Sequence, residues 1–357
     1  MLLGLLLLLL LLILYQVKFN FNGFNGDYLS RDCTNSIKGI FILLIVISHS
    51  LQYVRKSGYS FSGMGDMIFN SFFAFLGQLV VIMFLFYSGY GVGESYKRKK
   101  QDYISQFPKH RILATLLNYD VAVAVYIIFC ILLGVAITFK QSLIAFTAWL
   151  PIGYDGWHIM LMDNWYIFVI ILCYLVNYIM LSIGLSNRIC QVVLLFVMSV
   201  ACVIALSFLK SGEFWYNTIL CYPLGFLYSS YKEKIEPFLK RYYWGALLAL
   251  MILLVGAFSL FLSCQVANPF QLLYNAFCML FVMAVVMVTM KVGIGNAPLR
   301  WAGSHLFPIF IYMRLPMLVM EQKTPALVGT YPAVFILIAL AVTLLIARCY
   351  KYVEIKL

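Results

Sequence analysis

Repeated apolar stretches of about twenty residues restrict this chain to one fold class. Hydrophobic residues make up 64% of its 357 residues, whereas only 11% are charged. A helix needs about 20 apolar residues to cross the hydrocarbon core of a bilayer, and many runs here approach that length. No polar stretch is long enough to form a soluble domain. The sequence therefore predicts an all-α polytopic membrane protein.

Eleven membrane spans are expected from these apolar runs. They cover residues 2–15, 36–54, 72–93, 113–138, 159–184, 190–209, 214–231, 243–263, 271–290, 304–320 and 331–349. The apolar segment 141–150 is too short to span, so we expect it to be re-entrant or interfacial. The first run has no basic residue before it and no cleavage site of small residues, which favours a retained span over a signal peptide. We divide the chain into an N-terminal span and linker, residues 1–30, and a membrane domain, residues 31–357.

The basic residues are unevenly distributed between the two sides of these spans. Nineteen of the 25 Lys and Arg residues fall on one side, and Arg314 falls within a span. Five fall on the other side: Arg55, Lys56, Lys140, Lys210 and Lys323. Because cytoplasmic loops are enriched in basic residues, the N-terminus is predicted outside and the C-terminus in the cytoplasm. The net charge of +12 follows from this topology, so membrane lipid and not nucleic acid is the expected partner.

Two ionisable residues share one face of the second expected span. Lys38 and His49 are eleven residues apart, which on a helix is roughly 20° past whole turns and about 16.5 Å of rise. An ionisable group inside a bilayer is costly and indicates a functional site, and a neutral imidazole is suited to general-base catalysis. The alternative for His49 is a structural hydrogen bond to Ser48, Ser50 or another helix. The alternative for Lys38 is an anchor at the membrane surface.

Further basic residues indicate where an anionic ligand would bind. Arg314 lies about ten residues into the tenth expected span and stays charged, so it requires a polar cavity or a partner. The segment 94–100, with Lys109 and Arg111 after it, forms a dense basic patch on the predicted cytoplasmic side. Such a patch suits the phosphates of a nucleotide-type donor, and membrane topology with anionic lipid explains it equally well.

The longest loop on the opposite side, about residues 139–158, leads into the fifth expected span. His158, Asp163 and Trp165 lie near this junction and are candidates for contact with an acceptor outside the cell. Trp at this depth is also typical of an interface anchor. The nine cysteines lie mostly in apolar runs without a CxxC pair, so no metal site is expected.

Several segments, in the correct order over about residues 31–350, together resemble the acyltransferase-3 family of integral membrane acyltransferases. They are Lys38 to Ser50, with a basic residue and a histidine eleven positions later; 77–90, which ends in Ser88-Gly89-Tyr90; 109–112; 164–167; and 304–316. The first two are the more specific. At the position where many members carry a late histidine, this chain has Arg314. The resemblance implies a ten-span core, to which the leucine-rich run adds one span.

This resemblance also implies an activity. Members O-acylate surface and secreted glycans in bacteria, so the expected donor is acetyl-CoA or another acyl-CoA, and the expected acceptor is a glycan or lipid-linked saccharide at the bacterial cytoplasmic membrane. The donor's phosphates would be held by Lys38, Lys109 and Arg111, with Ser88 in the same site.

The catalytic roles expected from this resemblance fall to two residues. His49 would act as general base or acyl relay, and Arg314 would stabilise the developing oxyanion. Two alternatives remain: a transporter or flippase of glycan or lipid-linked sugar, and a non-catalytic scaffold in glycan assembly. The sequence leaves the oligomeric state open.

Overall fold

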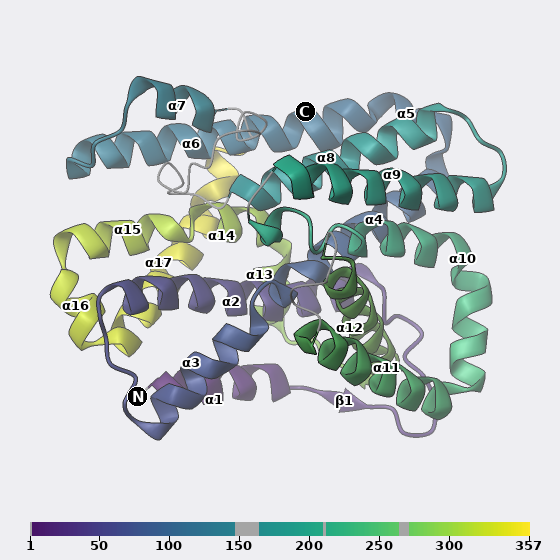
Figure 1. The fold of residues 1–357 in the computed structure, drawn as a ribbon, viewed down its shortest axis with the longest axis horizontal. Coiled ribbons are helices and arrows are strands. Elements are labelled where there is room, and N and C mark those ends of the chain that lie inside the picture. The colour runs from purple at the N-terminus through teal and green to yellow at the C-terminus, as the bar shows by residue number, and fades with distance from the viewer. Residues whose placement is uncertain (1, 147–163, 210–211, 264–270) are drawn as a thin grey trace.

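Long helices lie side by side and mostly follow the longest axis of the molecule (Figure 1). The structure, a computed structural model, describes residues 2–146, 164–209, 212–263 and 271–357. In chain order its helices are α1 Leu2–Leu14, α2 Arg31–Lys56, α3 Met64–Leu76, α4 Leu79–Lys99, α5 Gln101–Phe107, the π-helical η1 Pro108–Leu113, α6 Ala114–Leu133, α7 Phe139–Ala145, α8 Asn164–Ser182, α9 Arg188–Leu209, the 3-10 turn η2 Glu213–Trp215, α10 Cys221–Arg241, α11 Tyr243–Ser263, α12 Leu272–Lys291, α13 Ala297–Ser304, α14 Leu306–Tyr312, α15 Arg314–Lys323, α16 Pro325–Thr330, α17 Pro332–Cys349 and the 3-10 turn η4 Tyr350–Tyr352.

The prediction of an all-α polytopic membrane protein is confirmed. Within the described residues, eight helices are long and apolar enough to cross a membrane, and the bent pair α13 with α14–α15 raises the number to nine. Two of the eleven expected spans do not meet this test. At 1.5 Å per residue, the 13-residue α1 reaches about 20 Å, which is shorter than the roughly 30 Å of hydrocarbon. In place of the span at 214–231, α10 begins at Cys221 and continues into a basic segment that ends at Arg241.

Breaks in the helices differ from the expected boundaries for local reasons. The expected span 72–93 is divided into α3 and α4 at Gly77, whose φ of +43° favours glycine. The expected span 304–320 corresponds to α14 and α15, and a bend of 69° at its start separates it from α13. Of the apolar segment 141–150, residues 141–145 belong to the short helix α7.

Close approach of α2 to α13 positions the segment from Lys38 to Ser50. Ser30 caps α2, with its Oγ accepting a hydrogen bond from the backbone N–H of Cys33 at 3.3 Å. A Cβ added to Gly39 would collide with the carbonyl of Leu299, and one added to Gly303 would collide with backbone atoms of residue 35. Small residues allow membrane helices to approach to this distance. Gly39 and Gly303 therefore bring α13 directly against the Lys38 segment of α2.

The segment of α4 that contains Ser88-Gly89-Tyr90 is held in the same way against α10. A Cβ on Gly89 would collide with the carbonyl of Tyr222, and one on Gly225 would collide with the carbonyl of Phe86. Glycine at both positions lets the two membrane helices approach this closely. The rotational setting of α4, and with it the direction of Ser88, is consequently fixed by backbone contact.

The N-terminal segment is attached along the bundle. Asn296, at the start of α13, donates from Nδ2 to the carbonyl oxygens of Leu12 (2.7 Å) and Tyr15 (3.2 Å), so it satisfies carbonyls at the C-terminal end of α1. The linker then forms strand β1 (Lys18–Phe19), which pairs antiparallel with strand β2 (Val292–Gly293) after α12. Both ends of this segment are thus held by residues from the last third of the chain.

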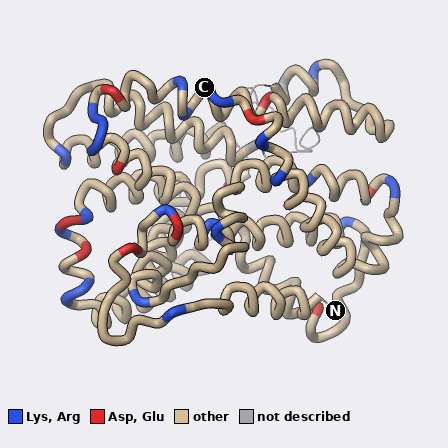
Figure 2. Tube along the Cα trace, turned by 180° about the vertical axis from the view of Figure 1, so that it is seen from behind, with Lys and Arg blue, Asp and Glu red and all other residues tan. Residues whose placement is uncertain are grey.

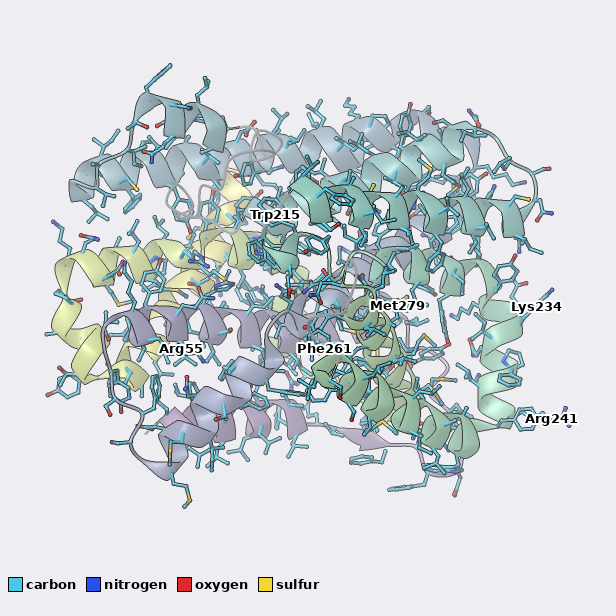
Figure 3. All side chains as sticks on the ribbon, viewed as in Figure 1. Arg55, Trp215, Lys234, Arg241, Phe261 and Met279 are labelled. Carbon is cyan, nitrogen blue, oxygen red and sulfur yellow. The ribbon has the colours of Figure 1, made fainter. Side chains whose placement is uncertain are left out.

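Charged residues are concentrated at the ends of the helices. Figure 2 shows many of the basic residues towards the end where α10 lies, on the left of that view, and fewer at the other end. Arg55, which was predicted outside, lies at the opposite end of the long axis from Lys234 and Arg241, which were predicted in the cytoplasm (Figure 3). This separation is what the predicted topology requires. Which end faces the cytoplasm stays a prediction.

Candidate functional site

A cavity of about 980 Å³ opens between α2, α4, α8 and the junction of α13 with α14. Its lining contains four basic residues: Arg31, Lys38, Arg98 and Arg111. Aromatic residues form much of the remaining wall: Phe84, Tyr87, Tyr90, Tyr166, Tyr174 and Phe307. Among the described residues that line it, Glu94 is the single acidic one. This volume lies near the upper end of the roughly 300–1,000 Å³ typical of cofactor pockets, and the lining suits an anion with an apolar portion.

Lys38 faces this cavity and not the lipid. Its Nζ donates a hydrogen bond to Oδ1 of Asn35 at 3.1 Å and lies 6.0 Å from the centroid of the Tyr87 ring. The neighbouring Gly39 is turned toward α13, so adjacent residues of one motif serve different purposes. The ammonium group is half-buried and lies in the wall, where a bound phosphate would meet it.

Ser88 faces the same cavity from α4. Its Oγ lies 2.8 Å from the hydroxyl of Tyr174 on α8, and either group can donate. The next residue, Gly89, contacts α10 instead. The Ser-Gly-Tyr motif therefore supplies a hydroxyl to the cavity and a glycine to the helix contact.

Arg111 and Lys109 were predicted to act together, but their side chains lie on different faces of the helix. Arg111 lines the cavity, with Cζ 6.0 Å from the centroid of the Tyr174 ring. Lys109 is exposed and does not line this cavity. Residues two apart on a helix point in nearly opposite directions, so only one of the pair can face inward. Both lie in the π-helical segment η1, a geometry found frequently at functional sites.

Glu94 is held by neighbours on α4 and α10. Its Oε1 accepts hydrogen bonds from Lys97 Nζ at 2.9 Å and from Ser229 Oγ at 2.8 Å. The ion pair with Lys97 offsets the carboxylate charge, so the cavity as a whole remains positive. Arg98 lies one helical turn beyond Glu94 and lines the same rim.

The linker before α2 supports this rim. Leu29 lines the cavity, and the adjacent Tyr28 is fully buried, with its hydroxyl 2.9 Å from the hydroxyl of Tyr228 and donating to Oε2 of Glu236 at 3.2 Å. Burial raises the pKa of Tyr28 above its ordinary value, and the hydrogen bond with Tyr228 and the charge of Glu236 raise it further. The Tyr28 hydroxyl therefore stays protonated as a donor that holds the linker on α10.

The catalytic candidates His49 and Arg314 meet in a separate cluster. Arg314 NH2 lies 2.8 Å from Nδ1 of His49 and 3.1 Å from Oε1 of Gln52, and Nδ1 lies 3.2 Å from the same Oε1. A guanidinium has no acceptor, so it donates to both groups. Nδ1 consequently accepts, which places the imidazole in its neutral form with the proton on Nε2. The sequence predicted either a polar cavity or a partner for Arg314, and the structure shows two partners, His49 and Gln52.

The cavity and the His49 cluster are linked through aromatic contacts. His49 lies eleven residues beyond Lys38 on α2, which corresponds to about 16.5 Å of helical rise. Tyr166 lines the cavity, and its ring centroid lies 5.1 Å from that of Phe310. Phe310 precedes Arg314 by one helical turn. The site therefore has a basic end and, beyond an aromatic wall, a His–Arg end.

The residues predicted on the acceptor side are only partly described. Trp165 is half-buried, with its ring centroid 5.9 Å from that of Tyr166 and 5.6 Å from that of Phe214. It therefore packs beside the aromatic wall of the cavity. His158 and Asp163 lie outside the described residues.

Sequence reasoning missed several residues of the site. Gln52 follows His49 by three positions and so shares its helical face, which was the available signal. Tyr174 on α8 and Arg31 at the start of α2 also line the cavity, but neither belongs to a segment that singled it out. Among the described residues, no group of three or more His, Cys, Asp or Glu is placed to hold a metal ion.

Comparison with known proteins identifies one family. A family model described as an acyltransferase domain matches residues 32–348, which is nearly the whole chain. No curated protein and no solved structure matches the chain.

Proposed function

We propose that this chain, which belongs to the acyltransferase-3 family and is thus a membrane acyltransferase, O-acylates a glycan. The acyl group, acetyl in the simplest case, would come from cytosolic acyl-CoA. It would pass to a hydroxyl of a cell-envelope or exported glycan, or of its lipid-linked precursor, at the bacterial cytoplasmic membrane. The observation that carries this proposal is the 980 Å³ cavity, where Lys38, Ser88 and Arg111 from three separate segments meet.

The donor would bind with its phosphates at the basic end of the cavity. Lys38 and Arg111 lie in the wall, and Arg31 and Arg98 add two exposed guanidinium groups at the rim. Guanidinium groups suit phosphates because they form paired, charge-assisted hydrogen bonds. Lys109 is left out of the donor site because it does not line this cavity. The thioester arm would then extend along α2 toward the aromatic wall and the His49 cluster.

The transfer step is proposed to occur at His49. The acceptor hydroxyl approaches Nδ1 and displaces the N–H of Arg314 from it. Its oxygen attacks the thioester carbonyl while its proton passes to Nδ1. The carbon–sulfur bond then breaks, and the thiolate takes the proton back from Nδ1. An ester, free CoA thiol and neutral imidazole result.

Arg314 has two tasks in this scheme. Its contact with Nδ1 keeps His49 neutral before reaction, because a second positive charge at 2.8 Å from a guanidinium is strongly disfavoured. Once displaced, its N–H groups are free to donate to the carbonyl oxygen as negative charge develops there. Trp165, with the predicted contributions of Asp163 and His158, is assigned to the acceptor side.

The proposal is tested with inside-out membrane vesicles supplied with radiolabelled acetyl-CoA. We expect label to enter an alkali-labile glycan fraction only in vesicles that contain the protein. Excess unlabelled CoA should reduce that label by competing for the basic cavity. Absence of protein-dependent label, in vesicles from a host that contains the acceptor glycan, would contradict the acyl-CoA donor or the glycan acceptor.

The donor site makes a sharper prediction for two neighbouring residues. Replacing Arg111 with glutamine is expected to raise the KM for acyl-CoA by about 10- to 100-fold, since a hydrogen bond to a charged group contributes roughly 1.5–3 kcal/mol. Replacing the exposed Lys109 with glutamine removes the same charge from the same helical segment. That variant should change KM by less than about twofold, as expected for an exposed charge. Equal effects of the two substitutions, measured by initial rates against acyl-CoA concentration, would contradict the assigned cavity.

A further inference from the structure

A second, smaller cavity lies apart from the acyl-transfer site, where α10 ends, α11 begins and α12 ends. Its volume is about 290 Å³. Three of its lining residues are basic: Lys240, Arg241 and Lys291. The aromatic rings of Phe24, Tyr243 and Trp244 complete most of the remaining wall. No Asp or Glu is among the described residues that line it, so the cavity carries an excess of positive charge.

The three basic residues differ in how far their charge is offset. Lys240 Nζ forms an ion pair with Glu236 at 2.6 Å. Lys291 Nζ donates to the carbonyl oxygen of Phe21 at 3.0 Å and lies 4.4 Å from the centroid of the Phe24 ring. Across the described part of the chain, neither Lys291 nor Arg241 forms an ion pair with an acidic residue. Two positive charges at this cavity are therefore available to an anion.

The surroundings of this cavity indicate the source of that anion. α11 begins at the cavity and is apolar enough to span a membrane, yet none of its apolar window is buried inside the protein. Leu248 and Ile252 are each 64% exposed, and Trp244 at the start of the helix is 70% exposed. This face would contact acyl chains in a bilayer, and Trp is typical at the level of the headgroups. An anion that carries acyl chains fits both the charged cavity and the apolar helix.

We propose that this cavity binds the headgroup phosphate of an anionic phospholipid whose acyl chains lie along α11. Arg241 and Lys291 contact the phosphate, and Arg241 projects at the end of α10 (Figure 3). Basic pockets at the ends of membrane helices bind anionic headgroups in this way. The proposal does not depend on the acyl-transfer assignment, because no residue of this cavity lines the larger one.

The linker before α2 builds one wall of this site. Phe24 comes from that linker and precedes residue 32, where the family match begins. The backbone N–H groups of Asn20 and Asn25 donate to the carbonyl oxygens of Lys291 (2.8 Å) and Met290 (2.7 Å), and these bonds hold the linker on the end of α12. Of the residues that line the cavity, Phe24 therefore lies outside the part of the chain that matches the family model, and the others lie within it.

Trp244 provides a probe at the site itself. The purified full-length protein is reconstituted into phosphatidylcholine vesicles that contain a minor fraction of either brominated phosphatidylglycerol or brominated phosphatidylcholine. Bromine quenches Trp fluorescence on contact. Comparison with a Trp244→Phe variant identifies the part of the quenched fluorescence that comes from Trp244. We expect stronger quenching of that part by phosphatidylglycerol. Equal quenching by the two lipids would overturn the proposal.

Substitutions at the cavity separate specific binding from general attraction to a charged surface. Arg241→Gln, and the double variant with Lys291→Gln, should lower the preference for phosphatidylglycerol roughly fivefold per cation, since one basic residue near the surface contributes ~1 kcal/mol. Lys234→Gln removes an exposed charge from the same helix outside the cavity and should leave the preference unchanged. A preference that is lost in Lys234→Gln but kept in the double variant would overturn the assignment.

A competition experiment with inorganic phosphate distinguishes a lipid from a free anion. Inorganic phosphate, compared with sodium chloride of equal ionic strength, should not relieve the quenching by phosphatidylglycerol, because it lacks the acyl chains that bind along α11. Relief by phosphate alone would show that the cavity prefers a soluble anion and would overturn the lipid assignment. The midpoint of thermal unfolding of each variant is measured in detergent. A midpoint equal to that of the wild-type protein shows that a lost lipid preference arises at the site and not from unfolding.

Discussion

Replacing His49 with alanine or glutamine is expected to lower acyl transfer by about 10²- to 10⁴-fold, the usual contribution of a general acid–base group. Neither side chain can accept the proton of the acceptor hydroxyl. Glutamine retains a polar group near Arg314 and Gln52, so it tests proton transfer more than local structure. The measurement is the initial rate of label transfer from acetyl-CoA in inside-out vesicles that contain equal amounts of protein.

Two further variants make this result specific. His110→Gln changes an exposed histidine in η1 that lines neither described cavity, and it should retain wild-type transfer. Arg314→Gln removes the guanidinium from Nδ1 and should lower the transfer rate by about 10²- to 10³-fold, with little change in the KM for acyl-CoA. Wild-type rates in both His49 variants would show that the acyl group is transferred elsewhere.

Replacing Gly89 with valine is expected to prevent stable folding of the helix bundle. The new Cβ would collide with the carbonyl of Tyr222 on α10, and backbone atoms at a helix contact cannot rotate away as a side-chain tip can. Overpacking of this kind typically costs up to about 3 kcal/mol, and more where two backbones must separate. We expect little monodisperse protein by size-exclusion chromatography in detergent, and a lower midpoint of thermal unfolding.

A glycine two positions away provides the matched control. Gly91 also lies on α4, but a Cβ added there meets no atom within 4 Å. Gly91→Ala should fold at least as well as the wild-type protein, because alanine favours a helix over glycine by roughly 1 kcal/mol. If Gly89→Val unfolds at the same temperature as Gly91→Ala, the close contact between α4 and α10 is not required for stability.

Much of the fold was predictable because membrane spans are a strong sequence signal. A span must satisfy its backbone hydrogen bonds internally and present apolar side chains to lipid, so its length and composition are legible without tertiary information. The expected spans 243–263 and 331–349 agree closely with α11 and α17. The expected span 214–231 differs in its bounds from α10, which begins at Cys221 and continues through a charged segment to Arg241, so that α10 is not among the helices apolar enough to span.

The site was predictable in its parts but not in its arrangement. Helical spacing placed Lys38 and His49 on one face of α2, and the cost of burying charge identified Arg314 as a residue that needs a partner. The sequence also treated Lys109 and Arg111 as equivalent. Only the direction of η1 against α8 decided that Arg111 faces the cavity beside Tyr174.

By itself, the sequence determined that this chain is a helical membrane protein and which residues are too polar to face lipid. Those properties depend on local composition and on periodicity along one helix. Only the tertiary structure decided that Arg314 donates to His49, since 265 positions separate the two residues. Such contacts depend on how whole helices approach one another, as at Gly39, Gly89 and Gly303, and no spacing within a single helix specifies that approach.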